Sequence, residues 1–258
     1  MELWTYEHKI TLIPALIVML IIAAVLRLTI GKKSLKIRMI PFQIFAVVIV
    51  LLEIGKQAVS LSKGYDLYHL PFHFCSLFIF MLPLMAFYRG KHRSVVTGIT
   101  AAITSAMFLL MIIYPNLIYG AWNINDYFKG FLDFHTVTFH NVVMLEFLLI
   151  VALDLHEPAA KGETKNAVWF TTGFCVVSAS MAHLLKTNYA NYYTCNIPPL
   201  EAVRQSVENA VGRLPAVLLY VAIVSALNIV FVIGAYWFYR LCRRILSPVQ
   251  KTSKSSVC

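Results

Sequence analysis

The chain has 258 residues, of which 59% are hydrophobic and 13% are charged, and its formal charge at pH 7 is +10. This composition is too apolar for an ordinary soluble domain, so we expect the lipid bilayer to be the main solvent of the chain. Because little soluble surface remains to carry the positive charge, that charge indicates membrane topology and contact with anionic lipids. Membrane lipids are the expected partners, and nucleic acid is not.

Seven apolar runs are each long enough, at about 1.5 Å per residue, to cross a hydrocarbon core of about 30 Å. The first is longer than a signal-peptide core and has no small-residue cleavage site with a positive flank before it, so we expect it to remain as a helix. In chain order the predicted spans are Ile10 to Ile30, Ile40 to Leu61, Leu70 to Phe87, Val95 to Tyr114, Phe134 to Leu153, Ala167 to Leu185 and Leu214 to Tyr239.

The connections between these runs differ in charge, which predicts how the chain is oriented. The connections after the first, third and fifth runs, together with the C-terminal end, hold fourteen lysines and arginines, against six on the other side. Positive charge favours the cytoplasm. The predicted fold class is therefore all-α: a polytopic seven-helix transmembrane bundle in the cell membrane, residues 1–246, with its N-terminus outside. A polar cytoplasmic tail, residues 247–258, follows the bundle.

Two features between the spans qualify this outline. In the long connection before the last run, Leu200, Val203, Val207 and Val211 recur at helical spacing, which predicts a short amphipathic helix at the membrane interface. This helix is either a connector that rests on the lipid head groups or a lid. The five cysteines are scattered without CxxC or zinc-ribbon spacing, so we expect no disulfide framework and no metal or other cofactor.

Polar side chains gather in the outer half of five of the predicted helices. An ionisable or amide group inside a span costs a few kcal/mol, so each needs a partner or a function. Their shared depth predicts a polar, hydrated cavity that opens to the extracytoplasmic leaflet. The residues are Glu53, Lys56, Gln57, His73, Cys75, Asn116, His135, His140, Asn141, His183 and Asn188.

Several of these residues also have simpler interpretations. Glu53 and Lys56 are three residues apart and can neutralise each other inside the bundle. His69 and His73, four apart, can share a metal ion with a histidine of another helix, or they form ordinary hydrogen bonds at the interface. Cys75 is a candidate nucleophile, but a regular helix turns it about 200° away from His73, so its base has to come from another helix.

Three motifs resemble those of the YwaF family of bacterial membrane proteins and of its eukaryotic relative, transmembrane protein 164. They are LPFHFCS at Leu70, TFHNVVML at Thr138 and AHLLKTNYANYYTCNIPP at Ala182, and the similarity covers the chain from about Leu52 onward. The eukaryotic branch implies an acyltransferase that remodels phospholipids through an acyl-cysteine with a histidine partner. The resemblance places those histidines at His140 and His183. It places the cysteine at Phe72, which departs from the pattern, while His73 is retained.

The expected function is therefore phospholipid acyl transfer or lipid hydrolysis in the extracytoplasmic leaflet. The candidate catalytic residues are His140, His73, His183 and Cys75. The candidate substrate-binding residues are Glu53, Lys56, Gln57, Asn116, His135, Asn141 and Asn188. The alternatives are a transporter or receptor that binds a small polar solute in the same cavity, and a zinc-dependent seven-helix hydrolase. The oligomeric state stays open.

Overall fold

The computed structural model describes residues 3–119, 127–155 and 162–246, and within them the secondary structure is entirely helical. The predicted tail, residues 247–258, lies outside the described residues. The longer helices are α1 (Tyr6–Ile30), α3 (Ile40–Ser62), α4 (Leu77–Phe87), α5 (Arg93–Ile113), α7 (Phe131–Ala152), α8 (Glu163–Leu185) and α10 (Arg213–Leu246). The shorter ones are α2 (Leu35–Arg38), α6 (Asn116–Tyr119), α9 (Pro198–Val211) and the 3₁₀ turns η1 (Leu67–His69), η2 (Phe74–Ser76) and η4 (Tyr189–Asn191).

Six of the described helical segments are long and apolar enough to cross a membrane. They are α1, α2 together with α3, α5, α7, α8 and α10. These agree with six of the seven predicted spans, and their ends differ from the predicted ones by a few residues, most at the end of α10. The chain is thus an all-helical, multi-pass membrane protein.

The third predicted span differs from its prediction. We expected a helix from Leu70 to Phe87, but regular helix begins at η2 and continues as α4, so the apolar helical stretch is Phe74–Phe87. Proline at position 71 has no amide hydrogen and disfavours helical backbone at Leu70. Residues 70–73 are consequently irregular, with Leu70 and His73 in extended conformations.

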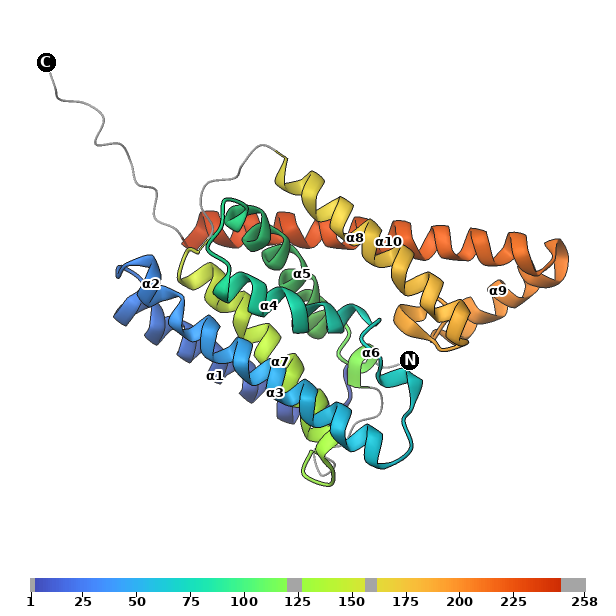
Figure 1. Ribbon diagram of the computed structural model, residues 1–258, viewed down its shortest axis with the longest axis horizontal. Coiled ribbons are helices and arrows are strands. Elements are labelled where there is room, and N and C mark those ends of the chain that lie inside the picture. Colours follow the sequence, from blue (N-terminus) through green and yellow to red (C-terminus); the bar gives the residue numbers. More distant parts are fainter. Residues whose placement is uncertain (1–2, 120–126, 156–161, 247–258) are drawn as a thin grey trace, which may run out of the picture.

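Two central helices organise the packing. α7 contacts α1, α3 and α5, while α5 also contacts α4, α8 and α10. Figure 1 shows the resulting arrangement, with α4 and α5 between the α1, α3 and α7 group and the long α10. The core is filled by large apolar side chains such as Phe42, Phe78 and Phe147, all almost completely buried. Because α5 and α7 are surrounded on several sides, the other long helices carry most of the exposed apolar surface.

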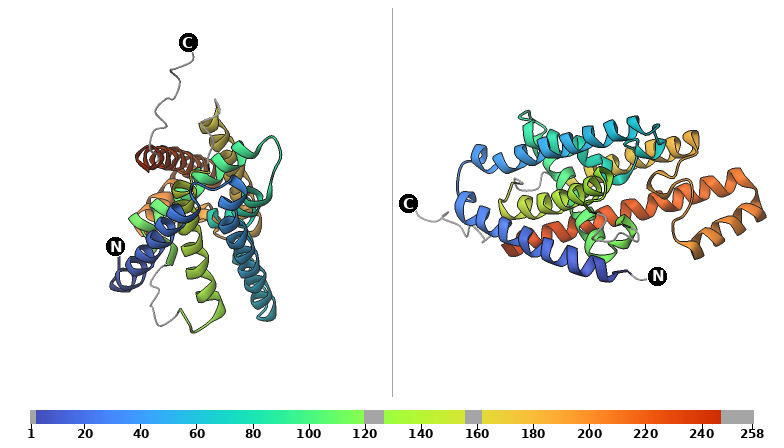
Figure 2. Two further views of the ribbon diagram at one scale, coloured as in Figure 1. Left: turned by 90° about the vertical axis from the view of Figure 1, so that its left-hand side faces the viewer. Right: turned by 90° about the horizontal axis from the view of Figure 1, so that it is seen from below.

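α10 is longer than a membrane is thick. Its 34 residues span about 51 Å at 1.5 Å per residue. It runs antiparallel to α9, which is the predicted amphipathic helix and is confirmed as a helix from Pro198 to Val211. The two form a hairpin that extends beyond the ends of the neighbouring helices (Figures 1 and 2).

At the opposite end of the molecule, three arginines join separate connections. Arg27 donates to the carbonyl oxygens of Ala152, at 3.3 Å, and of Leu246. Arg38 donates to Leu153 O at 2.6 Å, and Arg243 pairs with the Asp154 carboxylate at 2.8 Å. The ends of α1, α7 and α10 and the short helix α2 are thereby fastened together.

Candidate functional site

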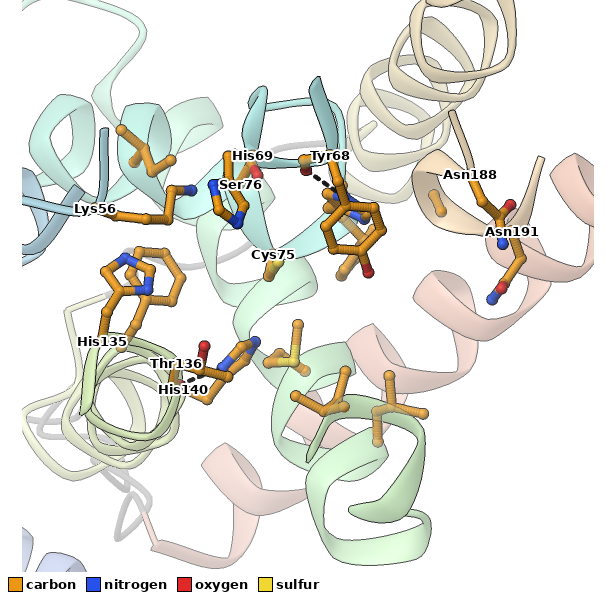
Figure 3. Close-up of a pocket in the computed structure, with 18 of the residues that line it drawn as sticks. Lys56, Tyr68, His69, Cys75, Ser76, His135, Thr136, His140, Asn188 and Asn191 are labelled. Atoms are coloured by element: carbon orange, nitrogen blue, oxygen red, sulfur yellow. Dashed lines mark hydrogen bonds between the residues drawn. The ribbon is translucent and has the colours of Figure 1, made fainter. Parts of the chain in front are cut away.

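A cavity of about 400 Å³ lies among the helices, near the end that holds η1 and η4. Its walls come from α3, the η1–η2 segment, α5, α7, η4 and α10, so chain segments far apart in sequence line one space (Figure 3). Its floor is apolar, with Ile79, Met107, Leu110, Phe139, Phe231 and Val232. Its polar lining includes Glu53, Lys56, Tyr68, His69, His73, Cys75, Ser76, His135, Thr136, His140, Asn188, Asn191, Asn196 and Asn228.

The segment from η1 to η2, residues 67–76, is held in place by side chains of neighbouring elements. Residues 70–73, between its two 3₁₀ turns, lack the hydrogen bonds of a regular helix. In η1, His69 O accepts a hydrogen bond from Gln57 Nε2 at 2.9 Å. Ser178 Oγ of α8 donates to Phe72 O at 2.8 Å. The Tyr189 hydroxyl donates to Leu67 O. The carbonyl oxygens of this segment are thus satisfied by other parts of the protein, and Tyr68, His69 and His73 of the segment line the cavity.

His140 of α7 presents one nitrogen without a partner. Its Nδ1 lies 2.6 Å from the carbonyl oxygen of Thr136, one turn earlier in the same helix. A carbonyl oxygen only accepts, so Nδ1 carries the hydrogen in this bond. In a neutral imidazole, Nε2 then holds the lone pair, and this atom is buried with no hydrogen-bond partner among the described residues. His140 is therefore oriented to accept a hydrogen bond or a proton at Nε2.

Glu53 of α3 is the centre of a second polar group in the wall. Lys56 Nζ lies 2.8 Å from Glu53 Oε1, so the two charges neutralise each other as an intrahelical pair. Gln57 Nε2 donates to the same oxygen at 2.7 Å. His135 Nε2 is 3.5 Å from the other oxygen, Oε2, which is too long for a good hydrogen bond. This half of the wall is polar, but its formal charges sum to zero.

Cys75 and Phe72 lie in different surroundings although they are three residues apart. Cys75 is in η2 and lines the cavity, as His140 does (Figure 3). Phe72 packs edge-on against Tyr189, with ring centroids 5.3 Å apart, and is not among the lining residues. His73 donates from Nε2 to Tyr68 O at 3.1 Å, because that carbonyl only accepts. The irregular backbone brings both His73 and Cys75 to the cavity, which a regular helix would not do.

Four asparagines, Asn188, Asn191, Asn196 and Asn228, form another part of the lining. Asn188 organises the turn after α8, since its Oδ1 accepts from the amides of Tyr193 and Thr194 at 3.2 and 3.1 Å. Its Nδ2 donates to Asn196 Oδ1 at 3.0 Å. Asn191 Oδ1 is buried without a partner among the described residues. We call these four side chains the amide wall.

The cavity brings together seven of the eleven residues that the sequence nominated: His73, Cys75, His140, Glu53, Lys56, His135 and Asn188. The other four lie outside its lining. Gln57 stands behind Glu53 and supports it, while His183 packs against Tyr193 with centroids 5.6 Å apart. Asn116 is in α6, and Asn141 follows His140 on α7.

The sequence reasoning did not nominate several lining residues. Asn228 was detectable, because an amide within an otherwise apolar run is costly and calls for a partner. Asn191 and Asn196 are in the motif that begins at Ala182, but their meeting depends on the fold of the turn. Thr136 contributes through its backbone carbonyl, which no pattern of side chains reveals.

No group of three or more His, Cys, Asp or Glu side chains is placed to share a metal ion, within the part of the chain that the structure describes. His69 instead forms a 2.7 Å hydrogen bond between Nδ1 and Ser60 Oγ. His73 is hydrogen-bonded to Tyr68 O, so each of the two histidines has a hydrogen-bond partner other than a metal ion.

The fold and the cavity together define a multi-pass helical membrane protein with a polar site among its helices. The model of the TMEM164 family matches residues 3–236, and the chain belongs to this family. The resemblance to transmembrane protein 164 is confirmed at this level, and the kinship with YwaF proteins is compatible with it. No curated protein and no solved structure matches the chain.

Proposed function

We propose that the chain is a lipid-active enzyme that carries out acyl transfer or hydrolysis on a phospholipid ester in this cavity. The observation that carries the proposal is the oriented imidazole of His140, whose unpartnered Nε2 lies in a cavity that Cys75 also lines. A thiol and a histidine base in one partly apolar pocket are the parts required for nucleophilic acyl transfer. Membership of the TMEM164 family supports the choice of a lipid substrate.

His140 acts in this proposal as the general base. Its Nδ1–H is fixed on Thr136 O, which holds the ring and selects the tautomer with a basic Nε2. The same helix-internal bond would stabilise the imidazolium form after proton uptake, as the orienting group of a catalytic triad does. Glu53, Lys56 and His135 supply polar contacts for the ester.

Cys75 acts as the nucleophile. Its sulfur attacks the ester carbonyl carbon while its proton passes to His140 Nε2, and the C–O bond of the ester breaks. The proton then goes to the departing alkoxide, which leaves as an alcohol, and the acyl group remains on sulfur as a thioester. An acceptor hydroxyl, or water in hydrolysis, attacks the thioester in turn. His140 takes its proton and returns it to the thiolate.

The proposal includes seven membrane crossings in the cell membrane, with the N-terminus outside. Between the end of α3 and the start of α5 the chain returns to the arginine-fastened end, through the irregular segment and Phe74–Phe87. This stretch makes the third crossing with only about 21 Å of helix. The connections rich in lysine and arginine share the arginine-fastened end, which supports a cytoplasmic placement of that end and an extracytoplasmic placement of the cavity.

A labelled-lipid assay tests the function. The purified full chain in nanodiscs is given a phospholipid with a radiolabelled acyl chain, and free fatty acid and new acyl lipids are separated and counted. His140→Gln keeps the size of the side chain and removes the basic nitrogen, so acyl release should fall about 100-fold or more. His92→Gln, at the exposed start of α5, is the matched control and should keep full activity.

The alternative of a transporter or receptor rests on the Glu53, Lys56 and His135 group, which offers donors and acceptors to a polar solute. It predicts saturable solute binding and unchanged lipid profiles in both wild type and His140→Gln. Equal acyl release by wild type and His140→Gln would overturn the enzyme proposal.

A further inference from the structure

The amide wall carries an inference about the substrate that rests on the proposed function. In Figure 3, Asn188 and Asn191 lie on one side of Cys75, and Lys56 and His135 lie on the other. The reacting groups are thus flanked by two different polar surfaces. We propose that the amide wall binds the uncharged polyol unit of a lipid head group, such as a glycerol or a sugar, through its hydroxyl groups.

The turn that presents Asn191 is conformationally strained. Ala190 and Asn191 are consecutive non-glycine residues with positive φ, 47° and 63°. Such backbone costs free energy and persists where the surroundings hold it, often at functional sites, and asparagine tolerates it better than most residues. Here the Tyr220 hydroxyl donates to Asn191 O at 2.6 Å, and the neighbouring Tyr189 hydroxyl is bonded to Leu67 O.

The strain places a polar atom in the wall without a protein partner. Asn191 Oδ1 is buried and unpaired among the described residues, although buried amide oxygens are nearly always hydrogen-bonded. Across the turn, Asn228 Nδ2 makes only a long contact of 3.4 Å with the Tyr192 hydroxyl. The wall therefore retains an acceptor and a weakly used donor for a ligand.

The chemistry of the wall selects the class of head group. An amide offers both a donor and an acceptor, which matches a hydroxyl, because a hydroxyl also does both. Glu53 and Lys56 are the formally charged residues in the described lining, and they neutralise each other on the opposite side. An ammonium head would meet no carboxylate at the amide wall. Glycerol and sugar units supply neighbouring hydroxyls and need no carboxylate to bind.

A binding experiment with short-chain lipids tests this inference. The purified full chain in detergent is titrated with dioctanoyl phosphatidylglycerol, a dioctanoyl glucosylglycerol and dioctanoyl phosphatidylethanolamine, and bound lipid is measured by native mass spectrometry. At least one polyol probe should bind about tenfold more tightly than the ethanolamine probe. The stronger of the two polyol probes identifies the source of the hydroxyls as a phospholipid or a glycolipid.

Two variants connect the preference to the wall. Asn191→Gly removes the amide and still accepts the positive φ, so the advantage of the polyol probe should fall about three- to tenfold. Ala190→Gly relaxes the same turn and keeps the amide, so the preference should remain. Asn228→Leu removes a second amide from a helix that tolerates leucine, and it should lower the preference for the polyol probe in the same way. It replaces Asn191→Gly as the test if that variant fails to fold.

Equal affinity for all three probes in the wild type would overturn the inference, as would an undiminished preference in the folded amide variants. Its failure is distinguishable from failure of the proposed function, because the readout is binding. Acyl release without a head-group preference overturns the polyol site alone. A preference without acyl release overturns the enzyme proposal alone.

Discussion

A histidine in a helix has the carbonyl oxygen four residues earlier within reach, and His140 uses it. The consequence is chemical, because the bond to Thr136 O assigns the hydrogen to Nδ1 and leaves Nε2 as the acceptor. The sequence nominated His140 from its depth and its motif. The orientation of its ring depends on the rotamer and on the packing of Tyr119 and Phe139 around it, which residue patterns do not encode.

Substitutions at positions 72 and 75 separate the two candidate sites for the thiol. Cys75→Ser should lower acyl release in the labelled-lipid assay about 100-fold or more, since a serine hydroxyl is a much weaker nucleophile without further activation. Phe72→Cys in the Cys75→Ser background should not restore it, because position 72 faces Tyr189 and not the cavity. Full activity in Cys75→Ser would leave His140 to activate the acceptor hydroxyl directly.

Glu146 and Glu163 form a contrasting pair of buried carboxyl groups. Both Glu146 oxygens are buried without a hydrogen-bond partner among the described residues, whereas Glu163 accepts a hydrogen bond from the Tyr236 hydroxyl. Glu146→Leu should therefore melt at or above the wild-type temperature, because it removes an unpaired polar group. Glu163→Leu should lose about 1–3 kcal/mol, since it leaves the Tyr236 hydroxyl without its acceptor. Thermal unfolding in detergent measures both, and a strongly destabilised Glu146→Leu would indicate a partner for this carboxyl.

At the scale of elements, the long helices were predictable and the broken one was not. Six apolar runs correspond to helices because the bilayer imposes both length and composition on a span. The third run is equally apolar, so hydropathy alone predicts a full helix there. Its first residues depart from helix because Pro71 removes a donor and because Ser178 satisfies Phe72 O from outside, while Gln57 and Tyr189 hold η1 just before them. Such long-range partners are not visible in a local window of sequence.

One arginine of α9 is at the centre of a network that reaches α10. Arg204 binds the Glu201 carboxylate with two nitrogens, at 2.7 and 2.8 Å, and reaches Glu208 at 2.9 Å. Its guanidinium also lies over the Tyr220 ring, 5.8 Å from the centroid. Since Tyr220 bonds Asn191 O, this network connects α9 to the turn that carries the amide wall.

The network predicts a pH dependence of the hairpin. The hydrogen bonds from Arg204 lower the pKa of Glu201 to about 2, from about 4.3 in an unfolded chain. A depressed pKa contributes stability above the unfolded value, and this is lost as the pH falls from about 4.3 towards 2. As the pH falls through that window, the melting temperature of the wild type should decrease more steeply than the melting temperature of Glu201→Gln. Parallel curves for the two proteins would contradict the role of this carboxylate.

At the scale of the whole molecule, the two ends are built differently. One end gathers η1, η4, the cavity and the strained turn, while the other is closed by arginine contacts to carbonyl oxygens at the end of α7. Positive side chains there also interact favourably with the negative, C-terminal end of the α7 dipole. The sequence predicted the charge bias of this end, but not that Arg27, Arg38 and Arg243 converge on the residues from Ala152 to Asp154.

Two substitutions at the arginine end distinguish its contacts from its charge. Arg38→Ala should lower the free energy of unfolding by about 1–2 kcal/mol, because it removes bonds to Leu153 O and Asp154 O. Lys33→Ala removes the same charge from an exposed site and should change stability little. Both variants should keep the wild-type orientation, measured with a C-terminal reporter, since each removes one positive charge of many. Equal stabilities for the two would show that the arginine contacts contribute nothing.

The length of α10 has a consequence for the membrane itself. Apolar side chains are exposed along it from Leu214 to Leu246, so an upright helix would carry apolar surface out of the hydrocarbon. Tilting avoids this mismatch, and the tilt a helix needs changes with bilayer thickness. Tyr220 lies on α10 and holds the carbonyl of Asn191. The length of the lipid chains is therefore expected to affect the site through the tilt of α10. Thin and thick bilayers should place the turn that contains Asn191 in different positions.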